Sequence, residues 1–227
     1  MTPIVSDLRF AARTLLRSPA YTFAGLTTLM LGIGFTTAVF SVVNGVLLSP
    51  LPFAEPEQLL RIWERDIAGE DEPFVAWRTF TDWRDGAQSF DAMVAHGPGR
   101  QTTVLVNGEP LYLGASGVSE GFLSTLGVTP ILGRDFIHEE HQRGADAAVV
   151  VSHEFWRSHL GGSPELAGFQ LRVRNHSARI IGVLPATFDY PADVGVWYPL
   201  ELNNQSESRT AHSLQVVGRL DVNASPS

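Results

Sequence analysis

Two reactive side chains are missing from this 227-residue chain, which contains no lysine and no cysteine. Without lysine it can form neither a Walker A phosphate-binding loop nor a Schiff base, because both need a lysine amine. Without cysteine it has neither disulfides nor thiolate chemistry. Its net charge of −8 argues against nucleic acid as a partner, since nucleic-acid affinity depends on many basic contacts to phosphate.

Charge of either sign is also missing from one long segment near the N-terminus. No Asp, Glu, Lys or Arg occurs between Ser18 and Ala54. The apolar core of this segment is longer than the roughly 7–15-residue apolar part of a signal peptide, and as a helix it exceeds the roughly 30 Å hydrocarbon layer. A soluble core helix of this length would show a polar face, whereas the polar residues here are mainly threonines, which lipid tolerates. The sequence therefore predicts a transmembrane helix at residues 21–49.

The arginines around this segment predict its orientation in the membrane. Arg9, Arg13 and Arg17 precede it, and two glutamates follow it before the next arginine. By the positive-inside rule, the N-terminus lies in the cytoplasm and the residues after Pro50 lie outside it. We therefore expect a membrane protein with one span in this chain.

The same three arginines recur every four residues and so form one stripe of a helix. Residues 1–20 are predicted to be a cytoplasmic basic amphipathic helix that lies on membrane lipid. The alternative is that the arginines only flank the span and set its topology. With residues 21–49 as the span, residues 50–227 form the extracytoplasmic domain.

Aromatic residues recur in the first part of the extracytoplasmic domain. Phe74, Trp77, Phe80 and Trp83 are spaced by three, which favours a helix that buries an aromatic stripe in the core. An aromatic ligand pocket is the alternative interpretation.

Turn residues and apolar alternation predict the strands of the same domain. An Asn-Gly dipeptide between two apolar runs is typical of a tight hairpin, because both residues tolerate positive φ. Strands are predicted at 103–106 and 110–113 around Asn107-Gly108, at 169–174 and 178–184 around Asn175-His176, and at 213–222. Hairpins mixed with separate short helices indicate an α+β fold.

One short pattern occurs twice, at Val118-Ser119 and at Val151-Ser152. Each serine precedes a phenylalanine by three residues and is followed later by a Leu-Gly pair, which predicts a serine N-cap, a short helix and a glycine stop. Ser119 also lies in a Gly-x-Ser-x-Gly pattern, the nucleophile elbow of hydrolases. Capping is the favoured interpretation, because Ser152 has the same setting without flanking glycines and the hairpins disagree with a hydrolase sheet.

The sequence His138-Glu139-Glu140-His141 suggests a metal hypothesis. The zincin motif needs histidine at the fifth position, where this chain has Gln142. The pair could bind a metal only with ligands from elsewhere, and exposed loop histidines are the alternative. No paired carboxylates or glycine-rich loop have an assignable role, so we predict no enzyme and assign no catalytic, cofactor-binding or metal-binding residue.

A series of landmarks runs in order along nearly the whole chain. They are residues 15–22, Leu31-Gly32-Ile33-Gly34, residues 38–48, Pro50-Leu51-Pro52-Phe53, Val118-Ser119, Leu126-Gly127-Val128, Leu132-Gly133-Arg134-Asp135-Phe136, Val151-Ser152, Phe155-Trp156, Ile181-Gly182-Val183-Leu184-Pro185 and Val196-Trp197-Tyr198-Pro199-Leu200. With these landmarks the chain resembles MacB/FtsX-type ABC-transporter permeases, and most closely their acidobacterial duplicated-permease group.

The resemblance implies a permease with four spans, whose first helix precedes a MacB-like periplasmic core domain. It implies a cytoplasmic ABC ATP-binding subunit as partner, together with a homodimer or paired permease and a periplasmic adaptor protein. ATP-driven closure would pass through the helices to the periplasmic domain, which is called mechanotransmission, for efflux or other envelope processes. Since no second apolar run follows Leu48, we expect an incomplete domain and an N-terminal part of a longer permease.

Two alternatives to a permease subunit remain at the level of sequence. One is a single-span membrane-anchored binding or sensor domain that acts outside the cytoplasm without an ATPase. The other is an anchored hydrolase that uses Ser119. A copurifying ATPase distinguishes the permease from the sensor.

Overall fold

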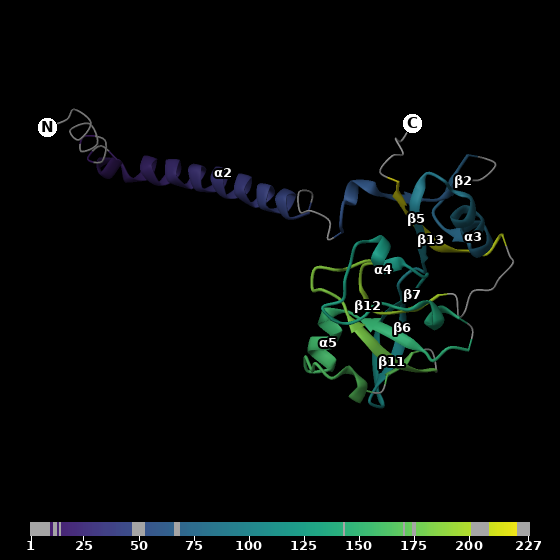
Figure 1. The fold of residues 1–227 in the computed structure, drawn as a ribbon. Coiled ribbons are helices and arrows are strands. Elements are labelled where there is room, and N and C mark those ends of the chain that lie inside the picture. The colour runs from purple at the N-terminus through teal and green to yellow at the C-terminus, as the bar shows by residue number, and fades with distance from the viewer. Residues whose placement is uncertain are drawn as a thin grey trace. The chain divides into compact units, whose positions relative to one another are not determined.

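The computed structural model describes residues 10, 13, 15–46, 53–65, 69–142, 144–169, 171–173, 176–200 and 209–221 (Figure 1). The chain divides into two compact units, Met1–Leu51 and Pro52–Ser227.

The first unit contains the long helix α2 (Pro19–Val46). Its 28 residues span about 42 Å at about 1.5 Å per residue, which is enough to cross a bilayer. Pro19–Ser41 has the length and composition of a membrane-spanning helix, and its most apolar stretch is not buried by protein. The helix predicted at residues 21–49 is thus present as far as Val46, and residues 47–49 lie outside the described part.

Three threonines of α2 bond their hydroxyl groups to their own helix. Thr27, Thr28 and Thr36 donate their hydroxyl hydrogens to the carbonyls four residues earlier, at 2.8 or 2.9 Å. Such bonds make hydroxyls acceptable in lipid, where no water is available to them. These three threonines therefore fit the predicted span.

The structure describes only part of the basic helix predicted at residues 1–20. Arg13 and residues 15–17 are helical, and Ser18 separates them from α2. Arg9 lies outside the described residues, so the continuous arginine stripe stays a prediction.

The second unit is a mixed α+β domain, as the sequence predicted. Its elements in chain order are η1 (Pro56–Gln58), β1 (Leu59–Ile62), β2 (Glu64–Arg65), β3 (Asp71–Glu72), β4 (Val75–Ala76), α3 (Trp77–Gly86), β5 (Phe90–His96), β6 (Arg100–Val106), β7 (Glu109–Val118), α4 (Phe122–Thr125), β8 (Leu132–Gly133), η2 (His138–His141), β9 (Ala148–Val151), α5 (His153–His159), η3 (Leu166–Gly168), β10 (Leu171–Val173), β11 (His176–Val183), β12 (Val194–Pro199) and β13 (His212–Leu220).

Six strands of this unit close into a ring of hydrogen-bonded neighbours. The order is β6, β7, β12, β9, β11 and β10, and β10 returns to pair with β6. The β7–β12 and β9–β11 pairs are parallel, and the other four pairs are antiparallel. Ring closure leaves no free edge among these strands. Apolar side chains such as Val104, Val151 and Val196 form the core of the ring.

Strand β9 shows how the sequence suits this arrangement. It reads Ala-Val-Val-Val and all four residues are buried. Val149 and Val151 belong to the core of the ring, whereas Ala148 and Val150 belong to a second cluster on the opposite face. A strand covered on both faces needs a continuous apolar run rather than alternation.

Outside the ring, the sheet continues from β7 through β5 and β13 to β1. Strands β5 and β7 share one ladder pair, between His96 and Val118. We call β1, β4, β5, β13 and α3 the outer lobe. Its core contains Phe80, which is completely buried, and Trp77 and Trp83 pack against that core. The predicted aromatic stripe is therefore core packing.

The aromatic helix begins later than the spacing of its residues suggests. Val75 and Ala76 form the short strand β4, which pairs with β13. The helix α3 can therefore start only at Trp77, and Phe74 precedes it.

Both predicted hairpins are present. In the β6–β7 hairpin, Asn107 and Gly108 have φ values of 51° and 92°, as a tight turn of this type requires. In the β10–β11 hairpin, Val173 pairs with His176, and the predicted turn residue Asn175 lies outside the described residues. Strand β13 corresponds to the strand predicted at 213–222.

Candidate functional site

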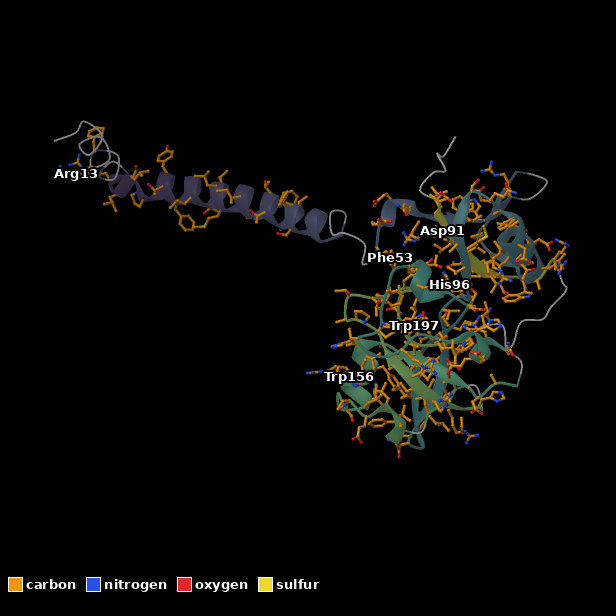
Figure 2. All side chains as sticks on the ribbon, in the orientation of Figure 1. Arg13, Phe53, Asp91, His96, Trp156 and Trp197 are labelled. Atoms are coloured by element: carbon orange, nitrogen blue, oxygen red, sulfur yellow. The ribbon has the colours of Figure 1, made fainter. Side chains whose placement is uncertain are left out.

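The segment that follows α2 in the sequence is the start of the second unit, and it packs against that unit's core. We call residues 53–59 the linker. Phe53 begins the linker and is labelled in Figure 2. Its ring lies edge-on to those of Tyr190 and Phe188, with 5.7 and 6.3 Å between centroids. The Ala54 N–H donates to the carbonyl of Leu126 at 3.3 Å. Because this segment connects the predicted membrane helix to the domain in the sequence, we take the linker and its contacts as the candidate functional site.

Helix α4 ends against the linker. Gly127 has a φ of +70°, and its N–H donates to the carbonyl of Ser124 at 3.0 Å, so it closes the helix as the sequence predicted. A Cβ atom at this position would collide with the side chain of Ala54. Glycine is therefore required both by the left-handed backbone and by the close approach of the linker.

The linker continues into β1, which pairs antiparallel with β13. The ladder runs from Leu59 opposite Arg219 to Ile62 opposite Val216. Strand β13 is the last strand that the structure describes. Among the described strands of this unit, the first and the last are thus hydrogen-bonded neighbours.

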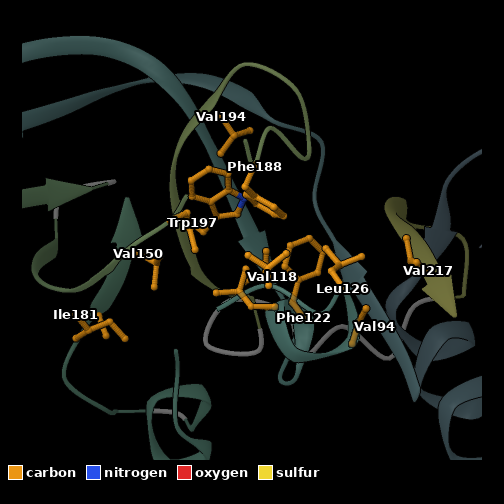
Figure 3. Packing of buried hydrophobic residues seen from close by; sticks show 14 residues of the cluster. Val94, Val118, Phe122, Leu126, Val150, Ile181, Phe188, Val194, Trp197 and Val217 are labelled. Carbon is orange, nitrogen blue, oxygen red and sulfur yellow. The ribbon is translucent and has the colours of Figure 1, made fainter. Parts of the chain in front are cut away.

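A cluster of buried apolar residues supports the linker (Figure 3). Trp197 is completely buried, its ring centroid lies 5.6 Å from that of Phe188, and its Nε1–H donates to the Tyr190 carbonyl at 3.2 Å. Phe122 of α4 stacks nearly parallel to the Tyr190 ring. The aromatic side chain of the linker therefore packs on residues that are themselves held in the core.

His96 lies at the point where the outer lobe meets the ring. Its side chain is completely buried, and its ring lies 4.9 Å from that of Tyr190. Nδ1 lies 2.9 Å from the Gly97 carbonyl, and Nε2 lies 2.9 Å from the Tyr190 hydroxyl. A carbonyl can only accept, so Nδ1 carries the proton, and the Tyr190 hydroxyl donates to Nε2. This arrangement uses the neutral imidazole.

The surroundings of His96 disfavour its charged form. Burial lowers the pKa of His96 to about 4, helped by the positive charge of Arg61, although the Gly97 carbonyl acts in the opposite direction. Burial also raises the pKa of the Tyr190 hydroxyl. Both groups are therefore neutral near pH 7 and act as a buried hydrogen-bonded pair.

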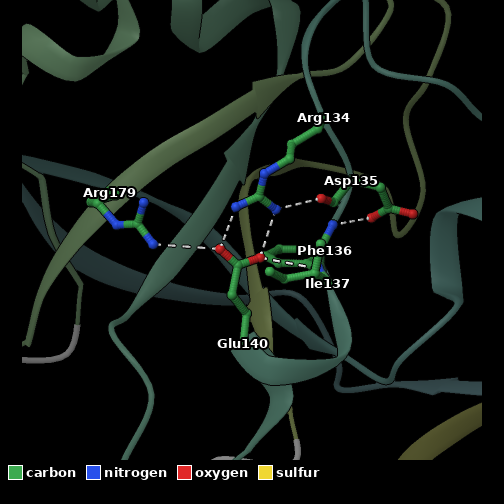
Figure 4. Close-up of polar contacts among 6 residues, drawn as sticks. All are labelled: Arg134, Asp135, Phe136, Ile137, Glu140 and Arg179. Carbon is green, nitrogen blue, oxygen red and sulfur yellow. Dashed lines mark hydrogen bonds and ion pairs between the residues drawn. The ribbon is translucent and has the colours of Figure 1, made fainter.

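A second polar cluster holds the loop after β8 to β11. The Glu140 side chain is only 5% exposed, and its two oxygens accept hydrogen bonds from Arg134 at 2.7 and 2.8 Å (Figure 4). The Ile137 N–H donates to the same carboxylate at 3.1 Å, and Arg179 lies 3.6 Å from it. Burial acts to raise the pKa of Glu140, but these bonds and charges outweigh it and leave the pKa below its usual value.

Two glycines allow the backbones of β8 and β11 to approach closely beside this cluster. Gly133 and Gly182 are paired across β8 and β11, and a Cβ atom on either would clash with the opposite backbone. The Arg134 N–H then donates to the Ile181 carbonyl at 2.9 Å. Both glycines belong to landmarks of the sequence, and close backbone approach explains why no side chain fits there.

The structure corrects the capping role predicted for Ser119. Its Oγ accepts a hydrogen bond from the Ala95 N–H at 2.8 Å, and its own N–H donates to the Ala95 carbonyl at 2.8 Å. Ser119 therefore continues the β5–β7 pairing, and Gly121 with φ of 78° begins α4 without a side-chain cap. The buried hydroxyl is engaged with the backbone, which argues against its use as a nucleophile. By contrast, Ser152 caps α5 as predicted, accepting from the Phe155 N–H at 3.1 Å.

The two histidines of the metal hypothesis have different surroundings. His138 is exposed, and its Nδ1 lies 2.9 Å from Glu120, whose hydrogen bond raises the pKa of the imidazole. His141 is buried and packs edge-on to Phe136, so the expectation that both are exposed loop histidines is wrong for His141. Within the described ranges no three His, Asp or Glu side chains come together as a metal site would require.

A surface hollow of 640 Å³ lies beside the ring. Its lining includes Tyr112, Glu154, Asp189 and Asp193. Two histidines, His153 and His159, share this lining with the three carboxylates.

Residues 22–227 match the family model described as "MacB-like periplasmic core domain". The fold is similar to the periplasmic region of MacB from Actinobacillus actinomycetemcomitans, with a TM-score of 0.58, 10% identity, and coverage of 74% of this chain and 77% of that one. It is also similar to the extracellular domain of the noncanonic ABC-type transporter YknZ from Gram-positive bacteria, with a TM-score of 0.52, 15% identity, and coverage of 73% and 84%. No curated protein sequence matches the chain.

The burial of neutral His96 predicts a stability that depends on pH. As the pH falls from about 6.5 to about 4, the unfolded histidine binds a proton that the folded one does not, so the free energy of unfolding should fall by about 3 kcal/mol. All five tryptophans belong to the second unit, so their fluorescence during urea unfolding measures it directly. His96→Asn should remove this part of the pH dependence. The exposed control His159→Asn should retain it, and equal slopes in the two variants would contradict the assignment.

The Glu140 carboxylate predicts a second, local contribution to stability. Glu140→Gln leaves Arg134 without its bidentate partner, and we expect the free energy of unfolding to fall by about 2 kcal/mol. This is less than the usual cost of breaking a fully buried pair, because Arg134 is partly exposed. Glu139→Gln, at the exposed neighbouring position, should change it by less than about 0.5 kcal/mol. Urea unfolding at pH 7 compares the two variants. Similar losses in both would show that the ion pair does not stabilise the loop.

Proposed function

The chain belongs to the family of proteins with a MacB-like periplasmic core domain, as its sequence landmarks predicted, and from this premise we propose that it is a permease subunit, or the N-terminal part of one, of a MacB/FtsX-type ABC transporter. In this role it would couple ATP hydrolysis by a partner subunit to motion of the periplasmic domain, for efflux or other processes of the cell envelope. One observation carries the proposal. A candidate membrane span leads, through a short linker, into a domain of this family.

The proposed topology follows from the charges around α2. Residues 1–20 lie in the cytoplasm, residues 21–49 cross the inner membrane, and residues 50–227 form the periplasmic domain. The arginines before the span and the glutamates after it support this orientation.

In this proposal the ATP-binding function belongs to a partner subunit. The chain contains no lysine and so cannot supply a Walker A loop of its own. Its contribution is mechanical: the helix α2 moves with the ATPase, and the linker passes that movement to the paired strands β1 and β13. A second permease copy and a periplasmic adaptor would complete the assembly.

The topology can be tested cleanly because the chain has no native cysteine. We expect Asn107→Cys, in the β6–β7 turn, to react with a membrane-impermeant maleimide in cells whose outer membrane is permeabilised. Arg13→Cys should react only after the inner membrane is opened. Labelling in the reverse order would place the domain in the cytoplasm and exclude the proposed function.

The coupling partner can be tested by purification of the tagged chain from membranes of its own host in mild detergent. We expect a copurifying polypeptide with a Walker A lysine, identified by mass spectrometry, together with ATP hydrolysis in the purified fraction. Arg13→Glu combined with Arg17→Glu should reduce its recovery if the basic segment lies beside the ATPase. Purification of the chain without any such polypeptide would favour the single-span sensor domain.

A further inference from the structure

Arg219 lies on β13 directly opposite Leu59, the last residue of the linker. Its side chain is only 12% exposed, which is low for an arginine. Arginine is seldom buried to this extent unless its N–H groups have hydrogen-bond acceptors. The acceptors around Arg219 therefore indicate its structural role.

The guanidinium group donates to three acceptors, two in the linker and one in α4. Nη2 donates to the Ala54 carbonyl at 2.8 Å, and Nε donates to the Thr125 carbonyl at 2.8 Å. Nη1 donates to Oε1 of Gln58 at 3.4 Å, a longer bond. One side chain of β13 thus joins both ends of the linker to the C-terminal turn of α4.

These acceptors depend on an outside donor. The Thr125 carbonyl is in the last turn of α4, where carbonyls have no partner within the helix. The Ala54 carbonyl belongs to an irregular stretch before η1, outside any ladder. A planar guanidinium can serve both at once with fixed geometry, whereas the ammonium of lysine is a point donor on a flexible stem.

The contact is made through carbonyls rather than through a paired carboxylate. The nearest acidic group, Glu55, is 64% exposed and lies 3.9 Å from Nη1, near the limit of an ion pair. A surface pair of this kind contributes little. The charge of Glu55 is therefore a natural control for the role of Arg219.

We propose that Arg219 is a positioning residue that clamps the linker to α4 and to β13, so that the linker cannot move without the last strand. The inference rests on the proposed function, because it names the residue through which motion of the membrane helix would reach the periplasmic domain. The linker and β13 then act as one mechanical unit.

Hydrogen–deuterium exchange of the whole chain in detergent micelles tests the clamp. Arg219→Met keeps much of the apolar stem but removes all three donors, and we expect exchange in residues 53–59 to become about tenfold faster or more, as for a local opening. Exchange in β9, in the core of the ring, should stay within about twofold of the unchanged chain. Arg219→Lys should give an intermediate acceleration, because it keeps one donor group.

Two matched controls accompany these variants. Glu55→Gln and Arg172→Met, the latter at an exposed arginine of β10, should leave exchange in the linker unchanged. Unchanged linker exchange in Arg219→Met would overturn the proposal. Equal acceleration in the linker and in β9 would also overturn it, because it would mean general destabilisation rather than a clamp.

A second measurement separates the clamp from the proposed function. In the complex with the copurified ATPase, we expect ATP to change hydrogen exchange in β13, and we expect Arg219→Met to abolish that change while ATP hydrolysis continues. An ATP response that persists in Arg219→Met would refute the coupling role. If no ATPase copurifies, the proposed function fails, and the exchange result on the chain alone still decides whether the clamp exists.

Discussion

Backbone pairing along β7 connects the parts of the periplasmic-type domain. This strand is antiparallel to β6, parallel to β12 and, at its Val118 end, paired with β5 of the outer lobe. The bonds from Gly97 N–H to the Gly117 carbonyl and from Ser119 N–H to the Ala95 carbonyl, both 2.8 Å, extend that last contact. The ring and the outer lobe are therefore parts of one hydrogen-bonded sheet, and the buried His96 lies where the two meet.

Local sequence signals were sufficient for the elements that are held by local chemistry. The β6–β7 hairpin follows from Asn107-Gly108, the α5 cap from Ser152, and the span from the absence of charge in α2. Strand β5 and the parallel pairs β9–β11 and β7–β12 could not be predicted in this way, because they depend on partners far away in the chain. Ser119 was misassigned for the same reason: its hydroxyl partner, Ala95, is on a strand that sequence alone did not reveal.

The residues of the candidate site were equally hidden in the sequence. Arg219 was only the end of a predicted strand, and its acceptors at Ala54 and Thr125 are backbone carbonyls that leave no sequence signal. His96 was one histidine beside apolar residues, a pattern with no motif. The landmark Leu132-Gly133-Arg134 did mark an important position, but the partner Glu140 first became identifiable from the structure.

The back-bonded threonines of α2 have a consequence for assembly within the bilayer. Thr27, Thr28 and Thr36 direct their hydroxyl hydrogens to carbonyls of their own helix, so those donors are not free for a neighbour. Gly25 and Gly32, by contrast, have no side chain, so the backbone of another helix could approach closely there. A neighbouring helix in lipid would therefore be recognised by steric fit and close backbone contact more than by polar groups.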